Sequence, residues 1–368
     1  MSDSREERLA RLLVEYCIAA RPGEWVLLYG DLLARPLVEQ IYRQLLAAGA
    51  HPTVFYQDEQ LHEHFYRLAD EQQLQWVSPL DTLLAERVAA RIVVRAPANT
   101  RALSNLAPKT ERTYQRAQKE ISDRYRWRAA AGTYRWTLTN FPCLALAQEA
   151  DMSLREFEDF VYAATYADQP DPVAAWQALH DRQQRLVDWL AGKSEVVVRG
   201  PQIDLRLSIA GRTFVNSDGR RNMPSGEIFT GPVEDSAEGW IRCGYPAIHG
   251  GRSVEGVELH LQQGRVVAAQ ASKNEAYLLS QLESDPGARY LGEFALGTNE
   301  QIRRFTHNIL YDEKIGGTLH VALGAGYPET GSRNESSLHW DLICDMRTDS
   351  EIWVDGELFY RNGRFTVL

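Results

Sequence analysis

Apolar and polar positions along the first hundred residues follow two different periods. Between Leu9 and Ala20 apolar residues recur about every 3.6 positions, which predicts an amphipathic helix that ends at a Pro-Gly pair. Short apolar runs at 25–29, 52–56 and 91–96 predict buried strands, and a second helical pattern lies between the first two of them. Strand, helix and strand make a βαβ unit, so we predict a parallel sheet covered by helices.

Residues 109–192 are predicted to be mostly helical. Ser153 and Glu156 form a capping-box motif at the start of one helix. An apolar stripe at helical period then extends to Leu190, and we assign it to core packing.

After Lys193 the pattern changes to short alternating segments separated by glycine-rich and Asn-Ser-Asp-Gly turns. This pattern is typical of antiparallel strands joined by tight turns. The predicted fold class is therefore α/β, with two domains. Residues 1–192 form an N-terminal three-layer-like α/β domain with a parallel sheet and a helical segment, and residues 193–368 form a C-terminal β-rich α+β catalytic domain.

Composition narrows the class of protein. The 368 residues carry a net charge of −10 and no cluster of Lys or Arg, which argues against a nucleic-acid or anionic-membrane partner. The amino terminus has no apolar signal region and no stretch is long enough to span a bilayer, so we expect a cytoplasmic protein. The four cysteines are at least a hundred residues apart, which predicts free, buried thiols.

The candidate chemistry is concentrated between Thr318 and Asp341. On a strand, His339 and Asp341 leave the same face and can offer an imidazole and a carboxylate to one metal ion. His320 lies in an apolar run, where a solvated histidine would be out of place. The sequence GAGYPETG predicts a tight loop that presents Tyr327 at the rim of a site.

Two glutamates extend this set. Glu227 follows a Pro-Ser-Gly turn, and Glu293 lies inside an apolar segment, where an unpaired carboxylate is costly to bury. With His320, His339 and Asp341 they make the ligand inventory for two divalent cations bridged by one carboxylate. Such a pair can bind water, lower its pKa and polarise a scissile carbonyl. Tyr327 would donate a hydrogen bond to the oxyanion or complete a metal shell.

Other chemistries lack their motifs. The sequence contains no GxGxxG at the first strand, no HExxH and no GxSxG, which excludes the usual dinucleotide, helix-borne zinc and serine-hydrolase sites. Asp312, Glu313 and Lys314 either help to bind substrate or form a solvated ion-paired turn, and adjacent opposite charges favour the turn.

Four motifs, NMPSGEIFTGP, GARYLGEFALGTN, ILYDEKIGGTLHVALGAGYPETG and SLHWDLICDM, resemble the thermophilic metallo-aminopeptidase family typified by aminopeptidases T, II and S. The resemblance implies two divalent metal ions per chain (Zn, Co, Mn or Fe), peptide substrates with a free N-terminus, and a homodimer whose sites face an enclosed chamber. It places the family's metal ligands at Glu227, Glu293, His320, His339 and Asp341, with Tyr327 as its tyrosine. We assign catalytic roles to Glu293 and Tyr327.

Two alternatives remain open at the level of sequence. A ring-cleaving dioxygenase with a single Fe(II) could use His339 and Asp341, with His320 or another nitrogen donor, as a facial triad, although Glu227 and Glu293 would then lack a cation. A non-catalytic metal-binding or scaffold protein could also retain the fold. Metal stoichiometry distinguishes the hydrolase from the dioxygenase, since the hydrolase is expected to hold two ions.

Overall fold

The computed structural model describes residues 3–106 and 108–368, and it divides into two compact units. The first unit extends to Ala175 and includes Gly219–Pro224, and the second comprises Trp176–Asp218 and Ser225–Leu368. The sequence predicts a domain boundary between residues 192 and 193. The structure instead divides the chain within helix α10 (Pro172–Leu190). The reason is that Leu186 and Leu190 are buried in the hydrophobic core of the second unit.

The first unit is built on a parallel sheet of order β2-β1-β3-β4-β8. Its strands are β1 (Trp25–Asp31), β2 (His51–Gln57), β3 (Ala90–Arg95), β4 (Arg135–Asn140) and β8 (Asn222–Met223). Its helices are α1 (Ser4–Arg11), η1 (Leu12–Cys17), η2 (Leu32–Ala34), α2 (Arg35–Ala47), α3 (Glu59–Leu68), α4 (Glu71–Gln75), α5 (Pro79–Arg87), α6 (Pro108–Ala117), α7 (Lys119–Ala130), α8 (Leu144–Glu149) and α9 (Leu154–Ala164).

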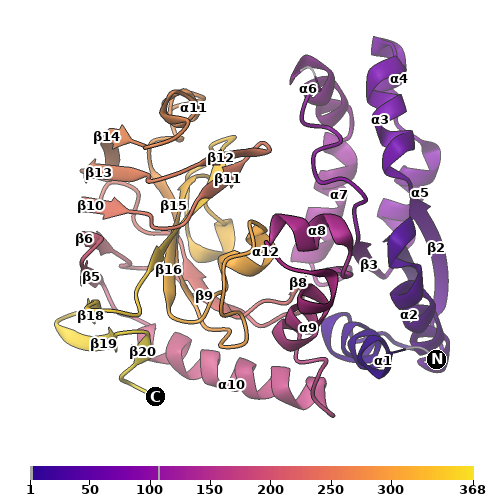
Figure 1. Cartoon of the computed structure of the whole chain (residues 1–368), viewed down its shortest axis with the longest axis horizontal. Helices are drawn as coiled ribbons and strands as arrows, with labels where there is room; N and C mark the ends of the chain where they lie inside the picture. Colours follow the sequence, from indigo (N-terminus) through magenta and orange to yellow (C-terminus); the bar gives the residue numbers. More distant parts are fainter. Residues whose placement is uncertain (1–2, 107) are drawn as a thin grey trace. The chain divides into compact units, whose positions relative to one another are not determined.

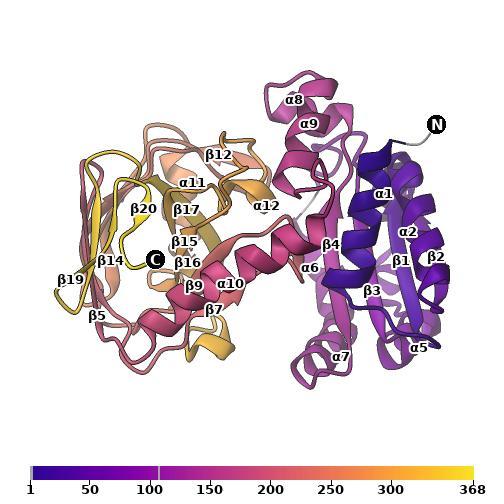
Figure 2. The same cartoon turned by 90° about the horizontal axis from the view of Figure 1, so that it is seen from below.

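Helices cover both faces of this parallel sheet, as the βαβ pattern predicts. Val38 of α2 lies over Gly30 on one face of β1. Leu27, on the opposite face of the same strand, packs with Leu84 of α5. The parallel strands and the neighbouring α1 and α2 can be followed in Figure 2. The predicted capping box of Ser153 is also present, at the start of α9.

The second unit is antiparallel throughout its described strand pairs (Figure 1). One sheet has the order β14-β13-β10-β6-β5-β18-β19-β20 and a second has the order β17-β16-β15-β9-β7, with a small pair β11-β12. The bounds are β5 (Glu195–Gly200), β6 (Ile203–Ser208), β7 (Val215–Ser217), β9 (Glu227–Thr230), β10 (Glu238–Arg242), β11 (Ala247–His249), β12 (Arg252–Val254), β13 (Glu258–Gln262), β14 (Arg265–Gln270), α11 (Glu275–Gln281), β15 (Leu291–Gly297), α12 (Ile309–Asp312), β16 (Thr318–Gly324), η3 (Pro328–Thr330), β17 (His339–Asp345), β18 (Glu351–Val354), β19 (Glu357–Arg361) and β20 (Arg364–Phe365). The β-rich C-terminal half predicted from the sequence is confirmed.

A single hydrophobic core joins the two large sheets of the second unit. Leu205 and Val198 enter it from the eight-stranded sheet, and Phe294, Val321 and Leu342 enter it from the five-stranded sheet. The four cysteines are buried, and none of them is assigned to a disulfide. No helix in the described part of the chain has both the length and the apolar character that a bilayer crossing requires.

We expect Leu342→Ala to lower the free energy of unfolding by about 2–5 kcal/mol, because Leu342 is fully buried between the sheets and the substitution leaves a cavity. Leu279→Ala on α11 is the matched control, since that leucine is 37% exposed, and it should cost less than about 1 kcal/mol. Chemical denaturation of both variants measures the difference. Equal losses would contradict the assigned core.

Candidate metal centre

Four adjacent strands of the five-stranded sheet carry the predicted ligands. Strand β9 supplies Glu227, β15 supplies Glu293, β16 supplies His320, and β17 supplies His339 and Asp341. These residues span more than a hundred positions of the sequence, and the antiparallel pairing of β9, β15, β16 and β17 brings them together.

The strand register places these side chains on one face of the sheet. Glu293, Ala322 and Asp341 lie opposite one another across three strands, and Gly297 lies opposite Glu227. Ala and Gly at these intervening positions leave room above the sheet for the larger polar side chains. Alternate residues of the same strands point the other way, into the core: Ile228, Phe294, Leu296, Leu319, Val321, Leu323, Trp340 and Leu342.

A β-bulge at Gly292 directs Glu293 to this polar face. Leu291 is in the hydrophobic core, and in a regular strand the residue two positions later would share its face. The register shifts between Leu291 and Glu293, so that Glu293 points to the opposite side. Gly292 itself has no space for a side chain, because a Cβ would lie 2.1 Å from the carbonyl oxygen of Ala325.

Two groups of donor atoms share Glu293. In the first group, His320 Nε2 lies 3.6 Å from Glu227 Oε2 and 3.5 Å from Glu293 Oε1. In the second group, His339 Nε2 lies 3.4 Å from Glu293 Oε2 and 3.6 Å from Asp341 Oδ1. Within each group one donor atom from every member lies within 4.8 Å of the others. The two oxygens of Glu293 therefore face two different histidines.

These separations fit cation coordination better than direct hydrogen bonding. In a tetrahedral shell with metal–ligand bonds of about 2.0–2.2 Å, neighbouring ligand atoms lie about 3.3–3.6 Å apart. Glu227 Oε2 and Asp341 Oδ1 are buried and have no hydrogen-bond partner among the described residues. A buried carboxylate oxygen without a partner is costly, and a cation would remove that cost. The donor set thus fits divalent cations.

The imidazole of His339 is oriented by the backbone. Its Nδ1 lies 2.8 Å from the carbonyl oxygen of Ala325, so Nδ1 carries the proton and donates it in a hydrogen bond. This tautomer leaves the lone pair of Nε2 directed at Glu293 and Asp341. A backbone partner of this kind fixes the ring of a metal-binding histidine.

Burial and the neighbouring charges shift the pKa of both Glu293 and His320. Burial raises the pKa of Glu293, and the neighbouring carboxylates add to this increase. Burial lowers the pKa of His320, but Glu293, Glu227 and Asp341 together outweigh it, so the pKa of His320 is raised. Without metal, a proton on the imidazole therefore balances part of the carboxylate charge, and protons and cations compete for the same donors.

Tyr327 lies at the rim, as its loop predicts. The residue is 39% exposed, and its ring packs against the rings of His339 and Phe229, with centroids 5.3 and 5.2 Å away. Burial of the ring, followed by the charges of Glu293, Asp341 and Glu227, raises the pKa of Tyr327. The phenol therefore remains protonated at neutral pH and can donate a hydrogen bond.

The predicted solvated turn of Asp312, Glu313 and Lys314 lies largely inside the protein. The ion pair of Glu313 with Lys314 is present, but Lys314 is fully buried. Glu313 also forms a third group of possible ligands with His320 and Asp341. Asp312 is buried and accepts hydrogen bonds from the backbone and hydroxyl of Thr306, while burial raises its pKa to about 7. The prediction that these charges are solvated is therefore wrong: Asp312 and Lys314 are buried, and Glu313 and Lys314 lie beside the candidate ligands.

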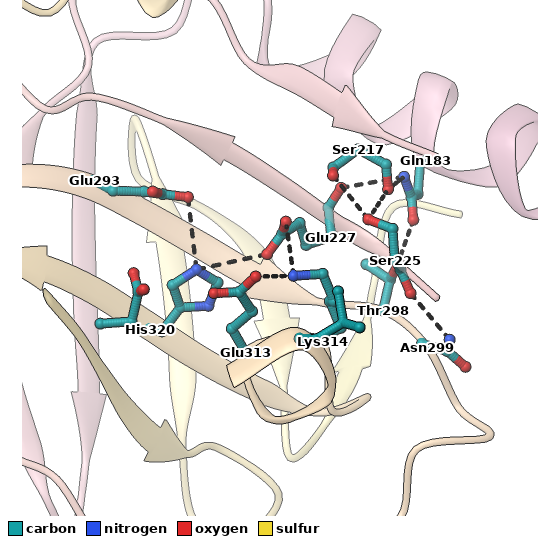
Figure 3. A network of polar contacts seen from close by, with 12 residues as sticks. Gln183, Ser217, Ser225, Glu227, Glu293, Thr298, Asn299, Glu313, Lys314 and His320 are labelled. Atoms are coloured by element: carbon teal, nitrogen blue, oxygen red, sulfur yellow. Dashed lines mark hydrogen bonds and ion pairs between the residues drawn. The ribbon is translucent and has the colours of Figure 1, made fainter. Parts of the chain in front are cut away.

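Gln183 of α10 holds the strand that carries Glu227 (Figure 3). Its fully buried amide nitrogen donates to the backbone carbonyl oxygens of Glu227 and Ser217, at 3.1 and 3.2 Å. Its amide oxygen accepts a hydrogen bond of 2.6 Å from Thr298 Oγ1. The backbone of Glu227 is therefore fixed independently of whatever its carboxylate binds.

Asp285 holds the loop between Tyr327 and His339. Its carboxylate accepts hydrogen bonds from the hydroxyls of Ser336 and Ser337 and from the backbone N–H of Ser337 and Gly287. Burial alone would raise the pKa of Asp285, but these hydrogen bonds prevail and lower it to about 2. The anchored segment ends two residues before His339, so Asp285 restrains one edge of the site.

The two-unit α/β fold and a sheet face of carboxylates and imidazoles define a metalloenzyme. The chain belongs to the family described as thermophilic metalloprotease (M29), whose sequence profile matches residues 2–365. The family resemblance inferred from the motifs is thereby confirmed, and so is the use of a divalent metal that a metalloprotease family implies.

Named relatives agree with this family. The chain is 30% identical to "Aminopeptidase 2" of Geobacillus stearothermophilus, with 95% of this chain and 90% of that protein covered. It is 29% identical to "Aminopeptidase T" of Thermus thermophilus, with 98% and 96% covered. The solved structure "Wild-type AmpT from Thermus thermophilus" is similar over 98% of this chain and 99% of its own, with a TM-score of 0.85 and 26% identity. The dioxygenase alternative finds no support among these proteins.

We expect Gly292→Ala to weaken metal binding by about tenfold or more, because it would displace the carboxylate of Glu293. Loss of a residue that only supports a metal ligand typically costs about 10–100-fold, and displacing a ligand should cost at least as much. The added methyl group would collide with the carbonyl oxygens of Ala325 and Gly324, and the bulge that directs Glu293 would have to shift. Isothermal titration of metal-free protein measures the change. Gly244→Ala is the control, since its nearest atom is the mobile amide end of Gln202 at 3.0 Å. Unchanged metal affinity in Gly292→Ala would refute the role of the bulge.

We expect Asp285→Asn to reduce stability near neutral pH but not at pH 2. The pKa of Asp285 in the folded protein, about 2, is below its ordinary value of 3.8, so its ionised form stabilises the fold above pH 3.8. That contribution is lost as pH falls from about 4 to about 2. The difference in unfolding free energy between wild type and variant, measured by denaturation from pH 6 to 2, should therefore shrink across this window. A constant difference would contradict the assignment.

Proposed function

We propose that this chain is a metal-dependent aminopeptidase that holds two divalent cations on the face of strands β9, β15, β16 and β17. One cation would be held by Glu227, Glu293 and His320, and the other by Glu293, His339 and Asp341. The observation that carries the proposal is that each oxygen of Glu293 faces a different histidine, at 3.5 and 3.4 Å. A carboxylate in that position is suited to bridge two cations.

The chemistry follows from the residues around the cations. When bound, divalent cations polarise a peptide carbonyl and make water more acidic. Tyr327, with its raised pKa, donates its phenolic proton in a hydrogen bond to the oxygen on which negative charge develops. Glu313 is close to His320 and Asp341 and offers a carboxylate oxygen that can take up a proton.

The choice of a substrate with a free amino terminus rests on the relatives. Glu227, Glu293 and Asp341 would be occupied by the two cations, so their charge alone does not select an α-ammonium group. Removal of amino acids from the N-terminal end of a peptide is the activity that the names of the relatives indicate.

Further features of the proposal come from the resemblance. The mixed oxygen and nitrogen donors suit Zn, Co, Mn or Fe, and availability would decide among them. We extend the proposal to a cytoplasmic homodimer, which sedimentation and cell fractionation would test.

We expect Glu293→Gln to remove both metal binding and hydrolysis while the fold persists. Glutamine has the same shape but cannot bridge two cations as an anion. Elemental analysis should give about two ions per wild-type chain and fewer than one per variant chain, with turnover of an amino-acid p-nitroanilide reduced at least about a hundredfold. Both proteins should be assayed after chelation and re-addition of each candidate metal.

The matched control is Glu351→Gln on β18, where the carboxylate pairs with Arg361 away from the polar face. It should retain full activity and metal content. Retained turnover by Glu293→Gln with two ions bound would overturn the bridging role. A single iron in wild type, with oxygen consumption, would replace the proposal by an oxygenase.

A further inference from the structure

Lys314 places a buried positive charge beside one of the two donor groups. The residue follows α12 and has no exposed surface. Its Nζ lies 3.5 Å from Glu227 Oε1 and contacts Glu313 Oε1 (Figure 3). A lysine is almost never fully buried unless its charge is paired. This ammonium group is therefore matched to the carboxylates of the site.

The other donor group has no such partner. In the described part of the chain, Asp341 forms an ion pair with His339 and none with a lysine or arginine. The two oxygens of Glu227 also have separate surroundings, because Oε1 faces Lys314 while Oε2 faces His320. The charge of Lys314 thus acts on one cation position more than on the other.

We propose that Lys314 is a positioning residue that acts as an internal counter-cation. In the metal-free protein it stabilises the assembled carboxylates, and in the metal-loaded protein it repels the cation between Glu227, Glu293 and His320. This proposal rests on the two-cation function above. It assigns tighter binding to the position of Glu293, His339 and Asp341, and weaker, more exchangeable binding to the position next to Lys314.

The direction of the effect follows from what holds Glu227 in place. Gln183 fixes the backbone of Glu227, and the pairing of β9 with β15 fixes its strand. Removal of the lysine charge therefore leaves the backbone of Glu227 in place and increases the negative potential at its carboxylate. The cation at this position should then bind more tightly, whereas a lysine needed only for packing would give weaker binding when replaced.

The test uses the full-length Lys314→Met protein, since methionine keeps much of the side-chain length without the charge. Metal-free protein is titrated with Zn²⁺ or Co²⁺ by calorimetry, and its melting temperature is measured with and without metal. The cation next to position 314 is expected to bind second in wild type, and we call it the second cation. We expect its Kd to decrease about tenfold or more in the variant. We also expect the Tm of the metal-free protein to fall by about 5 °C. The difference in Tm between the metal-loaded and the metal-free protein should therefore be larger in the variant than in wild type.

Lys193→Met is the matched control, because this lysine is in the same unit and pairs with the exposed Glu357. In this variant the Kd of the second cation, and the difference in Tm between the metal-loaded and the metal-free protein, should equal those of wild type. Weaker or unchanged binding of the second cation to Lys314→Met would overturn the proposal.

A second variant keeps the proposal testable if Lys314→Met does not fold. Lys314→Gln is also neutral but can still donate hydrogen bonds to Glu227 and Glu313, and it should lower the Kd of the cation next to position 314 about tenfold. An unchanged Kd would count against the counter-cation. A wild-type chain that binds no cation would refute the proposed function itself, whereas two cations of equal affinity would refute only the role of Lys314.

Discussion

Mutual repulsion among buried carboxylates is the constraint on which the C-terminal unit depends. Glu227 and Glu293 are buried on one sheet face, with Asp341 and Glu313 beside them. Like charges this close in a region of low dielectric cannot all remain ionised without positive charge nearby. Burial, with the neighbouring carboxylates, raises the pKa of Glu293, and the same carboxylates raise the pKa of His320 against the effect of its burial. In the proposed function, divalent cations bound between these carboxylates would supply further positive charge.

The sheet makes such an assembly possible because its other face is apolar. Phe294, Val321 and Leu342 are fixed in a packed core, and their neighbours along the strand are thereby held on the polar face. The positions between the ligands are small, as Ala322 and Gly297 illustrate. The packed core thus holds the strands that carry the donors, and its stability offsets the cost of concentrating negative charge.

Much of this arrangement could be predicted from sequence, and the failures have physical causes. The spacing of His339 and Asp341 predicts a shared face, and a glutamate inside the apolar segment around Glu293 indicates a buried cation partner; the structure brings all three together. Periodicity also predicts the parallel sheet and the β-rich second half. Lys314 and Glu313 were misassigned, because adjacent opposite charges have the same local pattern in a solvated turn and in a buried site. Burial there depends on residues far away in the chain. The bulge at Gly292 and the position of α10 are likewise set by tertiary packing.

The exposed fractions of the site residues show which side of the site is open to solvent. His320 is 1% exposed and Lys314 is fully buried, whereas Tyr327 is 39% exposed and the side chain of His339 is 31% exposed. Solvent therefore meets the site at the edge formed by β17 and the loop that Asp285 anchors. The closed side is the one where the lysine charge lies. A group arriving from solvent reaches the phenol of Tyr327 and the donors of His339 first, and Glu293 connects that open edge to the buried interior. The same carboxylate that divides the donors into two groups is thus the link between the accessible and the enclosed half of the site.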